Sequence, residues 1–275
     1  MLTAALLALA FLQQPAAQEQ AVPSSAEEQA QRIAAVVESM APSTPGVASV
    51  YFLGFAGYGE QRVFRKEAEL ARQVFADRFG SGARSIELIN DVHDRTTYPL
   101  ATLDNLRHAL RGIGDRMNRD TDILVVVLTS HGSARYGIAI TNGKLEDEDL
   151  SPRDLRRALD DAGIRWRIVV ASACYAGIFI DPLKTEATLI ITAADARHSS
   201  FGCADDRDLT YFGEALLKDS LPGSCSIQQA FAQADRLVRR RESDEGDTHS
   251  NPQIYIGQRM RAKLGDLDRV RGCHT

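Results

Sequence analysis

Two residues of this sequence, His131 and Cys174, have side chains suited to acyl-transfer chemistry. Each follows an apolar, β-branched run: residues 123–128 lead into Thr-Ser-His-Gly, and residues 167–171 lead into Ser-Ala-Cys-Tyr-Ala-Gly. Such runs are typical of buried strands in a parallel sheet, where ligands bind beyond the carboxyl ends of the strands. We therefore expect the two side chains to meet at one edge of the sheet. There Cys174 would attack an acyl carbon and His131 would move protons.

The elements that must position these residues alternate along the chain. Apolar runs predict strands at about 47–53, 86–90, 122–130, 166–172, 188–193 and 253–257. Amphipathic stretches predict helices at about 60–79, 103–117, 151–162, 209–218 and 227–241, and a polar hairpin is expected around 136–143. This order is typical of an α/β protein with a mostly parallel sheet covered by helices on both faces.

Length and charge narrow the function classes. A chain of 275 residues with 44% hydrophobic content can bury one large core. The net charge is −5 and no strongly basic face is evident, which argues against nucleic acid as a partner. We expect one folded domain over 47–275.

The N-terminus resembles an export signal. Residues 2–12 form an uninterrupted run of small and apolar side chains, too short to span a bilayer, so residues 1–17 are predicted to be a signal peptide. We expect a periplasmic or secreted protein that has no stable membrane insertion after cleavage. Residues 18–46 form a polar segment with one predicted helix, whose start carries a capping box of Ser25 and Glu28.

The four cysteines divide into two groups. Cys174 stands in the motif described above, which leaves Cys203, Cys225 and Cys273. In an exported protein three cysteines allow one disulfide and one thiol, and the sequence leaves the pairing open. The Asp-Val-His-Asp turn at 91–94 lacks a third ligand at suitable spacing, so neither a metal nor another cofactor is expected.

The motifs around His131 and Cys174 resemble the paired motifs of legumain-type cysteine peptidases. Segments 192–203 and 210–214 resemble the family in the corresponding places, and the similarity extends over about 47–257. It is greatest to the bacterial exported members. The resemblance implies a caspase-like three-layer sandwich with a mostly parallel central sheet.

It also implies an endopeptidase with a Cys-His dyad and no obligatory third member. Cys174 would form a thioester with the substrate, and His131 would give a proton to the leaving amine. The backbone N–H groups of Gly132 and Cys174 would form the oxyanion hole, which explains the small residue after His131. Val63 stands where the family has an asparagine near the dyad.

The resemblance further suggests which residues bind the side chain before the cleaved bond. Arg65 falls where the family has a pocket arginine and Glu214 where it has a pocket acid. Together they would offer a donor and an acceptor to Asn, or to protonated Asp. Ser172 replaces a glutamate of plant and animal legumains, which should broaden this preference.

Two alternatives share these observations. A transpeptidase or ligase would use the same dyad, because an amine can resolve a thioester as well as water can. A non-catalytic binding protein could retain the caspase fold, although loss of a dyad residue would have favoured it and both residues are present. The expected partner is a peptide or protein substrate, and the sequence makes no prediction of oligomeric state.

Overall fold

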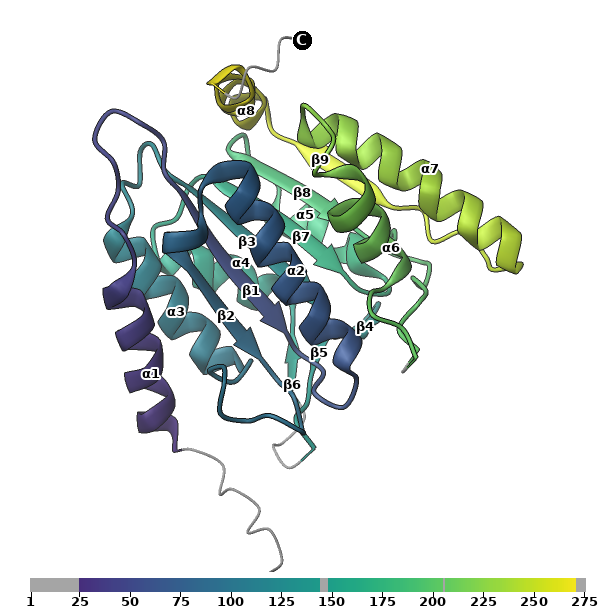
Figure 1. Cartoon of the computed structure of the whole chain (residues 1–275), viewed down its shortest axis with the longest axis horizontal. Coiled ribbons are helices and arrows are strands. Elements are labelled where there is room, and N and C mark those ends of the chain that lie inside the picture. Colours follow the sequence, from purple (N-terminus) through teal and green to yellow (C-terminus); the bar gives the residue numbers. More distant parts are fainter. Residues whose placement is uncertain (1–24, 144–147, 205, 271–275) are drawn as a thin grey trace, which may run out of the picture.

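Six strands form the central sheet of the computed structural model, which describes residues 25–143, 148–204 and 206–270 (Figure 1). The strand order is β2-β1-β3-β7-β8-β9, and only β9 runs antiparallel to its neighbour. The bounds are β1 Val50–Ala56, β2 Ser85–Ile89, β3 Ile123–Thr129, β7 Arg167–Ser172, β8 Thr188–Thr192 and β9 Gln253–Ile256. The mostly parallel sheet expected from the sequence is therefore confirmed.

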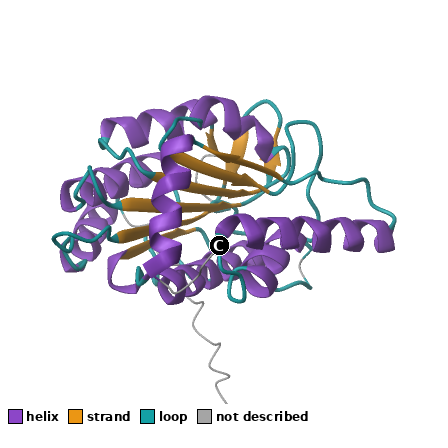
Figure 2. Cartoon of the chain, turned by 90° about the horizontal axis from the view of Figure 1, so that it is seen from above, coloured by secondary structure: helices purple, strands orange, loops and turns teal. Residues whose placement is uncertain are grey.

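Helices cover both faces of this sheet, which gives three layers (Figure 2). One face packs against α1 (Ala26–Ser39), α3 (Leu103–Arg116), α4 (Pro152–Asp161) and the short η2 (Ala176–Phe179) and α5 (Ile180–Leu183). The other packs against α2 (Arg62–Phe79), α6 (Tyr211–Gly213), the π-helical η3 (Glu214–Ser220), α7 (Ile227–Glu245) and α8 (Gln258–Val270). A short η1 (Gly82–Arg84) precedes β2.

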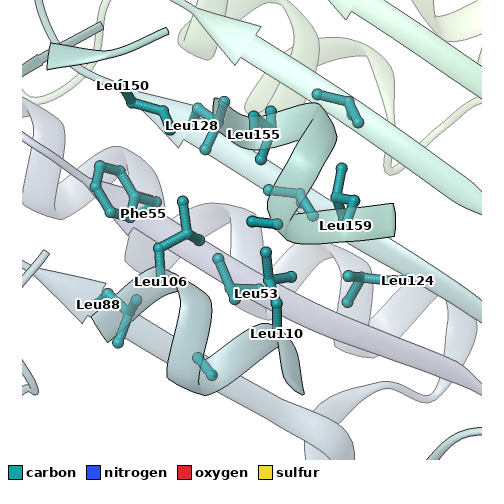
Figure 3. Packing of buried hydrophobic residues seen from close by; sticks show 14 of the residues in the cluster. Leu53, Phe55, Leu88, Leu106, Leu110, Leu124, Leu128, Leu150, Leu155 and Leu159 are labelled. Carbon is teal, nitrogen blue, oxygen red and sulfur yellow. The ribbon is translucent and has the colours of Figure 1, made fainter. Parts of the chain in front are cut away.

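Side-chain alternation along the strands fills both cores. Leu53 of β1 and Leu124 of β3 face α3 and α4, where they meet leucines such as Leu106 and Leu159 (Figure 3). Phe52 faces the opposite way, into the core under α2. Burying each such side chain contributes about 1.5–3 kcal/mol, so these layers hold the strand ends firmly in place.

A second, small sheet adjoins the end of β3. It consists of β4 (Gly132–Ser133), β5 (Gly137–Ile140) and β6 (Glu148–Leu150), and includes most of the predicted hairpin. The backbone N–H of Ala139 donates to the carbonyl of His131 at 3.0 Å, and the Ser130 hydroxyl donates to the carbonyl of Ala139 at 2.7 Å. The small sheet thus fixes the turn that carries His131.

Two local predictions can be compared with the structure. The capping box of Ser25 and Glu28 is present at the start of α1. The predicted helix at 209–218 is divided into α6 and the π-helical η3. Helix α8 was not expected, although Met260 and Leu264 on it are buried in the core. The predicted signal peptide at 1–17 lies outside the described residues.

Candidate active site

The turns that carry His131 and Cys174 touch each other. β3 and β7 are parallel neighbours with Thr129 opposite Ser172, so His131 and Cys174 each lie two residues beyond the paired strand ends. A β-carbon placed on Gly132 would lie 2.2 Å from the backbone oxygen of Cys174. The expected convergence at one sheet edge is thus observed for these two turns.

The sulfur of Cys174 contacts one residue of the loop that follows β8. The backbone N–H of Ser200 donates to Sγ at 3.3 Å, and the Ser200 hydroxyl lies 3.7 Å from Sγ. The thiol in turn donates to the carbonyl of Ser200 at 3.3 Å. These contacts with Ser200 fix the position of the sulfur. The Cys174 side chain is half-buried.

The residue after Cys174 has an unusual backbone. Tyr175 has φ +57°, a left-handed conformation that is rare for a bulky residue. Its N–H donates to the carbonyl of His198 at 2.9 Å, which holds the turn from the loop after β8. Backbone strain of this kind persists only where the surroundings enforce it, so the turn at Cys174 is firmly fixed.

The imidazole of His131 is oriented by a residue that the sequence did not identify. Its Nε2 lies 2.6 Å from Oε1 of Gln61, the residue that precedes α2. An amide oxygen can only accept, so Nε2 carries the proton and Nδ1 keeps the lone pair that can take a proton from a thiol. Val63 is buried in an apolar cluster that includes Phe64.

Aromatic rings enclose the same imidazole. The ring centroids of Tyr58 and Phe64 lie 4.6 Å and 5.1 Å from that of His131, both in edge-to-face geometry. Burial lowers the pKa of His131 from its ordinary value of 6.5. At neutral pH the ring is therefore the uncharged form, which is the form that accepts a proton.

Arg65 and Glu214 lie in separate ion-pair clusters. Arg65 contacts Glu69 at 2.9 Å, Asp91 at 2.8 Å and Asp94 at 3.0 Å, so the turn at 91–94 serves as its partner. Glu214 contacts, in order of distance, Arg241 at 2.6 Å, Lys218 at 2.9 Å and Arg207 at 3.3 Å. Hydrogen bonds from Lys218 and Arg241 lower the pKa of Glu214.

The charges of Arg65 and Glu214 are thus both compensated within their own clusters. No hydrogen bond or ion pair joins the two side chains in the part of the chain that the structure describes. Ser172 is likewise turned inward: it is 3% exposed, and its hydroxyl lies 3.3 Å from the hydroxyl of Thr210. All three side chains thus have polar partners within the chain itself.

The remaining cysteines and possible metal ligands lie as follows. Cys225 is disulfide-bonded, whereas Cys174 and Cys203 are thiols. Cys273 lies outside the described residues. Over the described ranges, no group of three or more His, Cys, Asp or Glu side chains could hold a metal ion. No described helix is long and apolar enough to cross a membrane.

Comparison with known proteins adds two findings to this geometry. The model of the peptidase C13 family matches residues 111–263, more than half of the chain and a span that includes both motif turns. No curated protein matches the chain in sequence. Among solved structures, caspase-1 from Spodoptera frugiperda is similar with a TM-score of 0.53 at 13% identity, over 80% of this chain and 94% of that one. At this identity the similarity concerns the fold, which is caspase-like.

Proposed function

The chain belongs to the peptidase C13 family of cysteine peptidases and has a caspase-like fold, and from this premise we propose that Cys174 and His131 form its catalytic dyad. The observation that carries the proposal is the contact between the two motif turns at Gly132 and Cys174. It brings a thiol and an uncharged imidazole to one sheet edge, as nucleophilic catalysis requires.

The proposed first half-reaction forms a thioester. Nδ1 of His131 takes the thiol proton of Cys174, and the sulfur attacks the carbonyl carbon of the scissile bond. The backbone N–H groups of Gly132 and Cys174 donate to the oxyanion that develops. The imidazolium then protonates the leaving nitrogen, the C–N bond breaks, and the amine product departs with that proton.

The second half-reaction regenerates the enzyme. A water molecule attacks the thioester carbonyl while Nδ1 takes one of its protons, and the C–S bond breaks. The sulfur recovers the proton and the acid product leaves. An amine in place of water would give a new peptide bond, so hydrolysis and transpeptidation share every group of this site.

Gln61 has a defined part in this scheme. By accepting from Nε2 at 2.6 Å it fixes the tautomer that leaves Nδ1 available, and it would stabilise the imidazolium in both half-reactions. It would therefore act as a third residue that orients the imidazole. The family resemblance had pointed instead to position 63, where this chain has Val63.

For the side chain before the cleaved bond we retain Asn, or protonated Asp, as the proposed preference. Its support is the family resemblance around Arg65 and Glu214. The described contacts of both side chains are with other residues of the chain and do not themselves point to a substrate. Profiling of cleavage products with wild type and Arg65→Ala tests this. A preference for Asn that Arg65→Ala weakens supports the assignment, whereas an unchanged profile removes Arg65 from the substrate pocket.

Export is a further part of the proposal. The apolar run at 2–12 has the length of a signal-peptide core and lies outside the described residues. Expression of the full chain in a bacterial host, followed by determination of the N-terminus in each cell fraction, tests this. Cleavage near residue 17 with product outside the cytoplasm is expected.

The catalytic proposal is tested by mass spectrometry of the products from a peptide library. Wild type and Cys203→Ala should give the same internal cleavages, whereas Cys174→Ala should give none. Added amine peptides report transfer through ligated products. Cleavage by Cys174→Ala at the wild-type rate would remove the dyad from the account.

A further inference from the structure

A carboxyl group lies buried directly beneath the two motif turns. Glu67, on α2, is 0% exposed, and its Oε2 accepts from the hydroxyl of Thr210 at 2.6 Å and from the N–H of Thr210 at 3.2 Å. The groups that face it are uncharged: the hydroxyls of Thr129, Ser172 and Thr210, and the backbone of Gly213. In the described part of the chain Glu67 forms no ion pair.

Burial raises the pKa of Glu67, and the neighbouring hydroxyls oppose this rise only in part. A buried carboxyl without a counter-charge is more stable in its neutral form. Its Oε1 is buried and has no hydrogen-bond partner among the described residues. Oε2, by contrast, accepts the two hydrogen bonds from Thr210.

A short chain of hydrogen bonds connects Glu67 to both motif turns. Thr210 has one hydroxyl proton and donates it to Glu67, so Ser172 must donate to Thr210 over their 3.3 Å contact. The backbone carbonyl of Ser172 in turn accepts from the N–H of Ser130 at 3.3 Å. Ser172 lies two residues before Cys174, and Ser130 immediately precedes His131.

Gly213 provides the space that the carboxyl occupies. A β-carbon at this position would lie 2.0 Å from Oε2 of Glu67. The backbone of Gly213 is ordinary, with φ −59° and ψ −45°, so its conformation is open to any residue and glycine serves here for room. Its N–H donates to the Thr210 hydroxyl at 2.9 Å, which closes the network at the start of α6.

We propose that Glu67 is a positioning residue for the dyad, and that its carboxyl group holds Thr210 and Ser172 so that β7 ends with Cys174 in place. The inference rests on the proposed function, since it assigns Glu67 a role in the placement of that nucleophile. A displacement of about 1 Å in a reacting group can cost about a hundredfold in rate, so a buried network of this kind can govern turnover without touching substrate.

Replacement of Glu67 by Ala and by Gln separates this role from simple filling of the core. Glu67→Ala leaves the hydroxyl and the N–H of Thr210 without their acceptor and so loosens the contact of Thr210 with Ser172. We expect kcat to fall by about tenfold or more while KM changes by less than about threefold. Gln keeps an oxygen acceptor and should restore most of kcat at pH 6. Circular dichroism and thermal unfolding establish that each variant is folded.

The pH profile provides a readout that a purely structural role would not change. In wild type, ionisation of Glu67 at higher pH places an uncompensated charge in the buried network and should disturb it. The Gln amide cannot ionise, so kcat of Glu67→Gln should persist to higher pH than that of wild type. Glu87→Gln is the matched control, because Glu87 on β2 is also largely buried but contacts Arg72 rather than the motif turns. Its kcat profile should follow wild type.

A double-mutant cycle with Gly213→Ala tests the assignment where single variants are ambiguous. Gly213→Ala should lower kcat by displacing the carboxyl, and its effect should shrink by about fivefold or more in the Glu67→Ala background. Additive effects on kcat, or a folded Glu67→Ala enzyme with wild-type kcat, would overturn the role of Glu67. Absence of peptide cleavage by wild type would instead contradict the proposed function, so the two failures are distinct.

Discussion

Gly132 and Cys174 belong to turns that follow different strands, yet a β-carbon on Gly132 would lie 2.2 Å from the backbone oxygen of Cys174. No side chain fits in that space without moving one turn away from the other. The in-register pairing of Thr129 with Ser172 creates this contact, because both turns then start at the same level of the sheet. The spacing of the two proposed catalytic groups is thus set by the backbone.

Gly132→Ala should therefore abolish most of the activity while the protein stays folded. The added methyl group separates the turns and displaces one proposed oxyanion donor, and loss of such a donor typically costs about a hundredfold to a thousandfold in kcat. Peptide hydrolysis and circular dichroism measure the two effects. Gly223→Ala is the control, since a β-carbon there would meet nothing within 4 Å. Wild-type activity in Gly132→Ala would contradict the close approach of the turns.

The acid limb of activity should report the imidazole of His131. A protonated ring has no lone pair for the thiol proton, so kcat/KM should fall as the pH decreases through the pKa of His131. Because burial lowers this pKa, the midpoint should lie below 6.5. A pH profile of kcat/KM from 4 to 8 measures it. A single midpoint well above 6.5 would contradict an uncharged resting imidazole.

Substitution of Gln61 should move this limb in a defined direction. In Gln61→Glu a carboxylate would accept from Nε2 and favour the imidazolium, so the midpoint should rise by about one unit or more. Gln61→Ala removes the acceptor without adding charge, and should lower kcat by about tenfold without that rise. Identical profiles for wild type and Gln61→Glu would show that Gln61 does not orient the ring.

Site residues that follow a local sequence pattern could be predicted, whereas contacts between segments far apart in the sequence could not. His131 and Cys174 could be brought together because apolar runs mark parallel strands and their carboxyl ends share an edge. Gln61 could not, since its contact with His131 spans 70 positions and glutamine at a helix start carries no pattern. The ion pairs of Arg65 with acids of the turn at 91–94 could not be predicted either, because such loop contacts leave no periodic trace.

Some elements had a readable signal that was missed. Glu67 falls within the apolar stripe of α2 between Phe64 and Ala71, and an acid in such a stripe indicates a buried carboxyl. In α8, Met260 and Leu264 are spaced for one helix face, but a short charged segment near a chain end resembles a solvated tail. The boundary between α6 and η3 had no such signal, because π-helical hydrogen bonds depend on packing more than on composition.

Stability should depend on pH through Glu87. Burial raises the pKa of this carboxyl to about 7, while the unfolded chain titrates near 4.5. The folded state therefore binds the Glu87 proton more tightly than the unfolded chain does. The stabilisation that this proton provides is complete below about pH 4.5 and is lost as the pH rises to about 7. This loss amounts to about 3 kcal/mol. Glu87→Gln should flatten that part of the curve when the free energy of unfolding is measured by urea titration at several pH values. An unchanged slope would contradict the raised pKa.

The most direct test of the account is the mass of the covalent intermediate. Wild type mixed with a cleavable peptide and quenched in acid should gain the mass of the acyl part of that peptide, and digestion should locate the adduct on Cys174. Cys203→Ala should give the same adduct, and Cys174→Ala should give neither adduct nor product. An adduct that maps to Cys203, or turnover by Cys174→Ala, would contradict Cys174 as the nucleophile.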